Sequence, residues 1–281
     1  MALIALMIIV KPFLRWAGGK NWLIKELHKY LPDKFNNYYE PFLGGGSVFF
    51  YLKSQGFIQN SSYLSDLNGE LVETYQLIKS KPNDIIKRLS SFKNEQEFYY
   101  NMRSQVFTDS VDNAAKFLYL NRTSFNGIYR VNKNGEYNVP FGNRNLAKLF
   151  DLENLVDGSN MLSDTSISCM DFFDTIETIK KGDLIFLDPP YTVAHENNGF
   201  VKYNQKIFAW EDQVRLNEFL VKLNKLGAYF IMTNAAHISI EELYKDIGIY
   251  SKVNRPSSIG GKGAKRTAYN ELIFTNIVNG K

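Results

Sequence analysis

The chain has 281 residues, of which 44% are hydrophobic and 22% charged, so it can bury one sizeable core and a smaller insert. The net charge of +4 is too small to establish an anionic partner by itself. A single cysteine, Cys169, excludes an internal disulfide framework and a cysteine-based zinc site. The three histidines, His28, His195 and His237, have no metal-ligand spacing. We therefore expect a reduced, cytoplasmic protein without a metal.

Residues 1–10 are almost wholly apolar. This run is too short to span a bilayer, and it lacks the basic start and cleavage site of a secretory signal. We interpret it as an N-terminal strand or a packed arm, with a start-site artefact as the alternative. No membrane association is expected.

Two glycine-rich segments open the chain. Residues 13–20 (FLRWAGGK) precede an expected helix over 21–30, and residues 40–47 (EPFLGGGS) separate a short strand from an expected helix over 48–53. Glycine lets a backbone approach a ligand closely, and such a turn after a first strand is typical of the cofactor site of a doubly wound sheet. Neither the dinucleotide nor the phosphate-loop spacing is present, which disfavours a nicotinamide cofactor.

An acid follows about twenty residues later, at the end of an expected strand over 63–66. Asp66 is placed to bind the ribose hydroxyls of an adenosine-type cofactor. The other role for an acid here is to cap the following helix, although Asn68 can cap while Asp66 binds.

The segment Leu184–Tyr191 reads as a buried strand that ends at an acid, two prolines and an aromatic residue. Its apolar run predicts a parallel strand, which must stop at Pro189 because proline cannot donate to a sheet ladder. Groups just beyond such a strand face the ligand crevice. A carboxylate, a proline carbonyl and a flat ring suit a planar ligand with an amino group. An ordinary turn with a capping Asp188 is the alternative.

The middle of the chain changes pattern at residue 121. Residues 69–120 have helical apolar spacing, whereas residues 121–142 interleave basic and aromatic side chains around Asn134-Gly135, a two-residue hairpin signal. Such a mixture suits contacts to phosphates, base edges and stacked bases. A surface hairpin that buries its aromatics on one face is the other interpretation.

The remaining pattern continues the alternation of strands and helices. We expect a strand and turn over 167–172, a mobile lid over 192–206, a helix over 210–226 and strands over 229–234, 250–253 and 271–274. Five basic residues and no acids occur from Lys252 to Arg266, a patch that could follow a phosphate backbone or be a solvated loop.

Six motifs occur in an order that is specific when taken together. They are FLRWAGGK (13–20), EPFLGGGS (40–47), SDLN (65–68), NRxxFNGxxR (121–130), NVPFG (138–142) and DPPY (188–191). In this order, and over residues 13 to about 274, the chain resembles the Dam family of DNA adenine-N6 methyltransferases. The resemblance implies an α/β, Rossmann-like methyltransferase sheet with an inserted helical target-recognition domain that carries a β-hairpin. The catalytic domain would comprise residues 1–68 and 163–281, and the recognition domain residues 69–162.

The resemblance also implies S-adenosylmethionine as cofactor, with S-adenosylhomocysteine as product and no metal. The residues implied in its binding are Trp16, Ala17, Gly18, Lys20, Glu40, Pro41, Phe42, Gly44, Gly46, Ser47, Asp66, Asp171, Phe172 and Asp188. The target adenine would leave the duplex, since its amino group is otherwise paired. Catalysis would rest on Asp188, Pro189, Pro190 and Tyr191, with the carboxylate and the Pro189 carbonyl orienting the amino nitrogen while the ring stacks on the base.

Double-stranded DNA is the implied partner, and a GATC site is favoured. The residues implied in DNA contacts are Arg15, Arg122, Phe125, Asn126, Ile128, Arg130, Pro140, Lys262, Lys265 and Arg266. Among them, Arg130 would read the first guanine and Phe125 would wedge into the opened stack. Arg15 replaces a lysine that is common in relatives, and Asn143-Arg144 departs from one branch's pattern, so longer sites such as GATATC stay open. A cognate restriction endonuclease is a possible partner, and we expect a monomer.

Three rival functions make different demands on the sequence. A nicotinamide oxidoreductase fails on the glycine spacing and leaves the DPPY motif unexplained. Methyltransferases of RNA or of protein glutamine usually carry Asn in place of Asp188 and lack this insert. A non-catalytic DNA-binding protein on a methyltransferase fold would keep the recognition segment, but intact Asp188 and Tyr191 argue against it. Cofactor binding would discriminate this last alternative.

Overall fold

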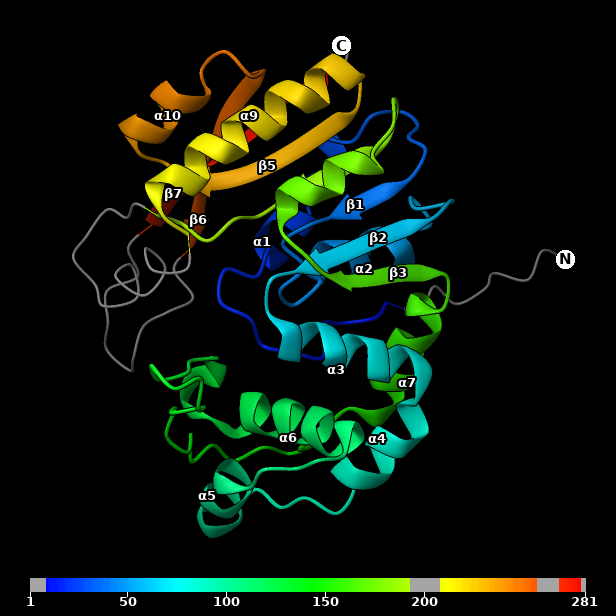
Figure 1. Ribbon diagram of the computed structural model, residues 1–281, viewed down its shortest axis with the longest axis vertical. Coiled ribbons are helices and arrows are strands. Elements are labelled where there is room, and N and C mark those ends of the chain that lie inside the picture. Colours follow the sequence, from blue (N-terminus) through cyan, green and yellow to red (C-terminus); the bar gives the residue numbers. More distant parts are fainter. Residues whose placement is uncertain (1–8, 193–207, 257–267, 279–281) are drawn as a thin grey trace, which may run out of the picture. The chain divides into compact units, whose positions relative to one another are not determined.

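The computed structural model describes residues 9–192, 208–256 and 268–278, and Figure 1 shows their helices and strands. The chain divides into two compact units. Unit 1 comprises Met1–Asn21 and Leu43–Cys169, and unit 2 comprises Trp22–Phe42 and Met170–Lys281. The expected N-terminal arm, most of the expected lid and most of the basic patch lie outside the described residues. The division into residues 69–162 and the rest, which concerns function, stays a prediction.

Unit 1 contains a parallel strand pair and most of the helices. Strands β2 (Ser62–Asp66) and β3 (Thr165–Cys169) pair in parallel, with Ser62 opposite Thr165 and Asp66 opposite Cys169. The helical elements are α2 (Ser47–Ser54), α3 (Gly69–Ser80), α4 (Pro82–Leu89), α5 (Gln96–Ser104), α6 (Ser110–Thr123), the 3-10 turn η2 (Phe125–Gly127) and α7 (Leu152–Leu162).

Local sequence explains where these helices begin. The side chains of Asn68 and Asp109 accept hydrogen bonds from backbone N–H groups in the first turns of α3 and α6, as N-cap residues do. Pro82 occupies the first position of α4, where its missing N–H costs nothing. The capping role that was an alternative for Asp66 therefore belongs to Asn68.

Helix α6 is the centre of the helical region, because it contacts α3, α4 and α5. Its buried Tyr119 and Leu120 form a core cluster with Tyr99 and Met102 of α5. Aromatic residues surround this cluster, and Phe92 meets the Tyr119 ring edge-on at a centroid distance of 5.3 Å. The region is thus held by a core of its own, apart from the strands.

In its described residues, unit 2 has five strands in the order β1-β4-β5-β7-β6. They are β1 (Tyr38–Glu40), β4 (Leu184–Leu187), β5 (Tyr229–Ala235), β6 (Ile249–Pro256) and β7 (Ala268–Thr275). The first three are parallel, whereas β7 pairs antiparallel with both β5 and β6. The helical elements are η1 (Leu27–Lys29), η3 (Phe172–Glu177), α9 (Trp210–Leu226) and α10 (Ile238–Tyr244), while α1 (Asn21–Ile24) begins at the unit boundary.

The expected α/β class is confirmed by these parallel strands and the helices between them. Every residue of β4 is buried, as its continuous apolar run predicts. Figure 1 shows α9 running along β5, and the two elements are in contact. Within the described residues, no helix is long and apolar enough to cross a membrane.

The expected helix over 21–30 is wrong in length. It is replaced by α1 and η1, because the backbone closes with bonds to the third preceding residue, such as Tyr30 N–H to the Leu27 carbonyl at 2.9 Å. Leu23 and Leu27 are nevertheless both buried. The apolar spacing identified the inward face but not the tighter winding.

Candidate active site and DNA-contacting segment

The acid that follows β4 is held in place by a neighbouring strand. Strands β4 and β5 are parallel with Leu187 opposite Met232, so the next pair in this register is Asp188 and Thr233. The buried Thr233 hydroxyl donates to Asp188 Oδ1 at 2.8 Å. Pro189 is buried beyond it, while Asp188 itself is half-buried. The strand end therefore presents an oriented carboxylate.

The aromatic residue of the same motif bonds to a second acid. The Tyr191 hydroxyl donates to Glu271 Oε2 at 2.8 Å, and Glu271 is only 2% exposed. Burial, followed by the charges of Glu271 and Asp188, holds the pKa of Tyr191 well above its ordinary value. The phenol therefore stays protonated and remains a donor across the physiological range.

A buried amide network fixes the residue after the motif. The Thr192 hydroxyl donates to the Phe208 carbonyl and accepts from Gln213 Nε2, both at 3.0 Å. The Gln213 Oε1 atom in turn accepts from Asn234 Nδ2 at 3.0 Å and from the Tyr244 hydroxyl at 2.7 Å. Because satisfied buried networks are rigid, Thr192 is anchored to α9, β5 and α10.

An aromatic cluster lies next to Asp171 in unit 2. The Phe42 ring stacks on Phe172 with centroids 5.3 Å apart, and Phe172 is buried. Asp171 accepts from the Phe173 N–H at 2.9 Å and forms an ion pair with Arg215 at 2.8 Å. The Arg215 guanidinium lies 5.2 Å from the centre of the Phe172 ring. These contacts already engage much of Asp171.

Glu40, at the end of β1, is also buried and hydrogen-bonded. The Tyr38 hydroxyl donates to Glu40 Oε2 at 2.6 Å. Burial and the neighbouring Glu40 charge raise the pKa of Tyr38 well above its ordinary value.

In unit 1, the predicted ribose-binding acid contacts the glycine turn. Asp66 Oδ2 accepts from the Gly44 N–H at 3.0 Å, and Oδ1 accepts from the Asn68 N–H at the same distance. Burial raises the pKa of Asp66, while these backbone donors lower it. Gly44 has a φ of 47°, and a Cβ atom there would lie 2.7 Å from Trp16 Cδ1. Only glycine lets this turn pass so close to the indole.

The lysine of the first glycine-rich motif is buried and bonds to a carbonyl of the same motif. Lys20 is 1% exposed, and its Nζ donates to the Gly18 carbonyl at 2.7 Å. The Lys20 N–H donates to the Ser47 hydroxyl at 3.2 Å, which ties the two glycine-rich segments together. Trp16 stacks on Tyr129 with centroids 5.3 Å apart. Unit 1 thus brings together Trp16, Gly18, Lys20, Gly44, Ser47 and Asp66, whereas Ala17 is exposed.

A buried asparagine joins the Arg15 backbone to the turn η2. Asn121 accepts from the Arg15 N–H at 2.8 Å, and it donates to the carbonyls of Arg15 at 2.7 Å and Gly127 at 3.4 Å. Gly127 has a φ of 65°, and a Cβ atom there would lie 2.6 Å from Arg15 Cδ. The Arg15 side chain is therefore fitted against a glycine.

The expected two-residue turn at Asn134-Gly135 is wrong. The Asn132 N–H donates to the Glu136 carbonyl and the Gly135 N–H to the Asn132 carbonyl, with a φ of 80° at Gly135. This pattern is that of a three-residue loop with a bulge at the left-handed glycine. The flanking chains meet only at the bridges Val131–Tyr137 and Ser124–Phe141. The segment is a loosely paired hairpin, since side chains replace much of its ladder.

The residues predicted to contact DNA differ in exposure. Phe125 is 52% exposed, and Arg130 and Pro140 are also exposed. The Arg130 Nε atom donates to Asn138 Oδ1 at 2.8 Å. By contrast, Arg122 uses Nε and Nη2 to donate to the carbonyls of Leu149 and Lys148.

Of the remaining predicted contacts, Arg15 and Asn126 are exposed and Ile128 is half-buried, whereas Lys262, Lys265 and Arg266 lie outside the described residues. Lys252, at the edge of the basic patch, lies 3.7 Å from Glu241, which offsets its charge.

Comparison with known proteins shows which family the chain belongs to. Residues 16–257 match the model of the D12 class N6 adenine-specific DNA methyltransferases. The chain belongs to this family. It is similar to the type II methyltransferase M1.LlaDCHI of Lactococcus lactis, with 34% identity over 97% of both chains, and to M.MjaIII of Methanocaldococcus jannaschii, with 36% identity over 95% of this chain and 99% of the relative. It is also 30% identical to a DNA adenine methylase of Vibrio cholerae, over 94% of this chain and 95% of the relative.

Family membership confirms the resemblance, the methyltransferase class of the α/β fold and adenine-specific DNA methylation as the family's activity. It also implies S-adenosylmethionine as methyl donor and DNA as substrate. In the described residues, no group of three or more potential metal ligands lies together.

Sequence reasoning missed two residues that touch the DPPY motif of this methyltransferase. Thr233 and Glu271 hydrogen-bond Asp188 and Tyr191. The available signal was that polar residues interrupt the apolar runs of two strands, Thr233 in β5 and Glu271 in β7. Their place beside the motif depends on strand register, which the sequence does not display.

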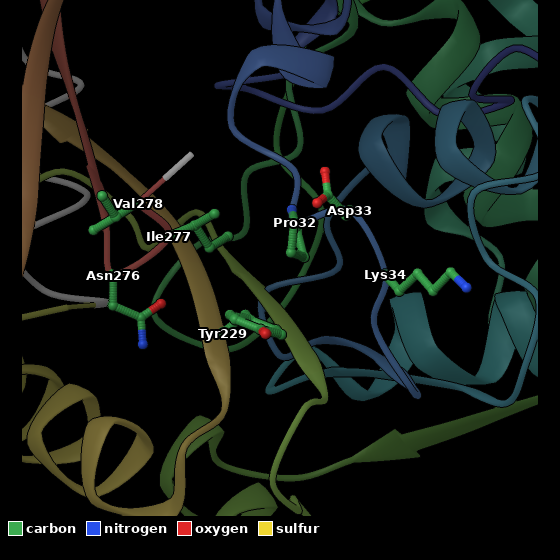
Figure 2. Close-up of a pocket in the computed structure, with 7 residues that line it drawn as sticks. All are labelled: Pro32, Asp33, Lys34, Tyr229, Asn276, Ile277 and Val278. Atoms are coloured by element: carbon green, nitrogen blue, oxygen red, sulfur yellow. The ribbon is translucent and has the colours of Figure 1, made fainter. Parts of the chain in front are cut away.

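A surface pocket of unit 2 lies elsewhere. Figure 2 shows its lining residues, which are Pro32, Asp33, Lys34, Tyr229, Asn276, Ile277 and Val278. Tyr229 is the first residue of β5 and lies opposite Leu184, the first residue of β4. Because the strands are parallel, this pocket is at the opposite end from Asp188. It is therefore separate from the DPPY site.

Proposed function

We propose that this methyltransferase transfers a methyl group from S-adenosylmethionine to N6 of an adenine that is flipped out of duplex DNA, in the site GATC. The observation that carries the proposal is the pair of held side chains after β4. Asp188 is oriented by Thr233 at 2.8 Å, and Tyr191 is bonded to Glu271 at 2.8 Å. This pair offers an acceptor for an amino group and a ring for a base, as adenine requires.

The cofactor residues are proposed on both the family's motifs and the local geometry. When bound, S-adenosylmethionine supplies a methyl group activated by its sulfonium. In unit 1, the close approach of Gly44 to Trp16 and the acid Asp66 on the same turn fit an adenosine group. In unit 2, we assign Glu40, Pro41, Phe42, Asp171 and Phe172 to cofactor binding on the family's motifs. The partly exposed ring of Phe42, stacked on Phe172, offers an apolar face to a base.

The chain's own residues act mainly by orientation. Asp188 and the Pro189 carbonyl accept the two N–H groups of the adenine amino group, so that its lone pair is directed toward the methyl donor. Charge that develops on the nitrogen is stabilised by the Asp188 carboxylate, and the proton can leave after transfer. Pro190 keeps the backbone rigid, and the Tyr191 ring stacks on the flipped base.

The recognition segment supports a site that begins with GA. Arg130 would form bidentate bonds to O6 and N7 of the first guanine, and the Asn138 contact leaves part of its guanidinium available. Phe125, which is 52% exposed, would fill the space left by the flipped base, with Asn126 beside it. Ile128 and Pro140 would contact the later bases. GATATC is the alternative site.

The backbone contacts and the partners are also proposals. Lys262, Lys265 and Arg266, together with Arg15 and Arg122, would follow the phosphates. The recognition domain would comprise residues 69–162, and the protein would act as a monomer. The type II names of two relatives make a restriction endonuclease of the same site a fitting partner.

The test measures transfer of labelled methyl groups to a duplex with a single GATC. We expect transfer to adenine N6, and none to a duplex in which the GATC adenines of both strands are already N6-methylated. Asp188→Ala should abolish transfer and leave DNA binding largely intact, because it removes only the acceptor of the amino group. Retained turnover in Asp188→Ala would refute the assigned chemistry, and equal transfer to a duplex without GATC would refute the site. A wild-type protein that binds S-adenosylmethionine and DNA without transferring methyl groups would instead favour the non-catalytic alternative.

A further inference from the structure

Glu271 is a buried acid that the proposed chemistry does not use. It is 2% exposed and directly precedes Leu272, Ile273 and Phe274 in β7. These three apolar residues are all buried. Burying a carboxylate is unfavourable unless hydrogen bonds compensate for the lost water. At such a position an apolar residue would be tolerated more easily, so the contacts of Glu271 indicate what the acid does.

The register of β5 and β7 places Glu271 on the same sheet face as Thr233. Glu271 lies opposite Ala235 and Ile273 opposite Thr233, so Glu271 and Thr233 are diagonal neighbours. Thr233 donates to Asp188 at 2.8 Å. Glu271 accepts from the Tyr191 hydroxyl at 2.8 Å. Thr233 and Glu271, which lie on one face of the sheet, therefore each hold one of the two motif residues.

This arrangement constrains the Tyr191 ring at both ends. Its backbone follows two prolines, whose rings fix their own φ angles and so stiffen the chain that leads to Tyr191. At the other end, a phenol O–H lies in the plane of its ring, so the position of the acceptor influences the plane as well as the place of the hydroxyl. A carboxylate fixed in the sheet can thus orient a ring that would otherwise turn about its long axis.

We propose that Glu271 is a positioning residue that sets the plane of the Tyr191 ring for stacking on the flipped adenine. The inference rests on the proposed function, in which Tyr191 stacks on that base. Glu271 itself touches neither adenine nor cofactor in this proposal. It acts through the hydroxyl of Tyr191, which makes its effect separable from a general effect on folding.

The test compares Glu271→Gln, which keeps an acceptor oxygen, with Glu271→Met, which has similar volume and no such oxygen. Single-turnover methyl transfer is measured on an adenine duplex. Stacking is measured on a duplex with 2-aminopurine at the target, whose fluorescence is quenched by a stacked ring. We expect Glu271→Met to slow transfer by about 10- to 100-fold and to raise the fluorescence of the bound duplex. Glu271→Gln should retain most of the rate and the quenching.

Tyr191→Phe supplies a second measurement, because it keeps the ring and removes only the hydroxyl. It should reproduce the rate and fluorescence of Glu271→Met, and the double variant should lose nothing further. Tyr119→Phe is the matched control, since it removes another buried phenol hydroxyl, one that donates to the Lys93 carbonyl at 2.8 Å and takes no part in the network around the DPPY motif. It should leave the fluorescence of the bound duplex unchanged.

Four outcomes would overturn the proposal. Wild-type rate and fluorescence in Glu271→Met would show that the acid does not position the ring, as would independent losses that multiply in the double variant. If Glu271→Met does not fold, wild-type behaviour of Tyr191→Phe would show the same. A wild-type protein that methylates no adenine would overturn both this inference and the proposed function, whereas wild-type methylation with an inert Glu271→Met change overturns the inference alone.

Discussion

The hydrogen bond from Thr233 to Asp188 should have a large effect on catalysis and a small effect on binding. Valine has nearly the shape of threonine, so Thr233→Val removes the hydroxyl that lies 2.8 Å from Asp188 Oδ1 and little else. Hydrogen bonds to charged groups contribute roughly 1.5–3 kcal/mol. With about 1.4 kcal/mol for each factor of ten in rate, transfer should slow by about 10- to 150-fold.

The assay is single-turnover methylation at saturating DNA and S-adenosylmethionine, together with the dissociation constant for DNA. A positioning effect lowers the transfer rate and leaves the dissociation constant close to that of the wild type. Thr275→Val is the matched control. Thr275 lies on the neighbouring strand β7, and its buried hydroxyl donates to the Phe230 carbonyl of β5 at 2.7 Å. It should cost comparable stability without slowing transfer. Equal rates in Thr233→Val and the wild type, or equal slowing in both variants, would refute the reasoning.

Three further predictions concern the cofactor turn, the recognition segment and alkaline pH. Gly44→Ala should weaken S-adenosylmethionine binding in calorimetry, because the added Cβ atom would lie 2.7 Å from Trp16 Cδ1. Gly56→Ala is the control and should not weaken binding, because Gly56 also has a positive φ but nothing lies within 4 Å of its added Cβ atom. Equal weakening in both variants would contradict this. Arg130→Ala should reduce discrimination at the first base pair by roughly 1–3 kcal/mol, and unchanged preference among substituted duplexes would remove it from recognition. Burial raises the pKa of Tyr119 to about 12. Because the same phenol ionises near pH 10 in the unfolded chain, the free energy of unfolding should stay constant below about pH 10 and fall from there to about pH 12. A flat pH profile in denaturant titrations would contradict this.

Much of the fold could be predicted because its signals are local. The pattern over 210–226 predicted α9 to the residue, since its apolar spacing is regular and Gly227 ends it in a left-handed conformation. The strand ending at Asp188 was equally clear, because prolines follow it. Helix α10 was not predicted, since it has only seven residues and His237 caps it. Helix α7 was missed because Asp157, Gly158 and Ser159 interrupt its helical pattern.

The candidate site was predicted only as far as motifs reach. Asp66 with Gly44, and Lys20 with Ser47, are brought together as the glycine-rich segments suggested. The support behind the DPPY motif was not predicted, because Thr233 and Glu271 reach it through strand register and the amide of Gln213 through helix packing. The contact of Arg130 with Asn138 was not predicted for the same reason, since the hairpin turn was assigned one residue too short.

Methylation of an unmethylated plasmid, followed by sequencing that distinguishes N6-methyladenine from adenine, tests both the proposed reaction and the proposed site. We expect N6-methyladenine at GATC and at no other sequence. A longer consensus that begins with GA would preserve the chemistry and change the assignment of the recognition segment. Absence of N6-methyladenine, from a protein that demonstrably binds S-adenosylmethionine and the plasmid, would contradict the proposed function.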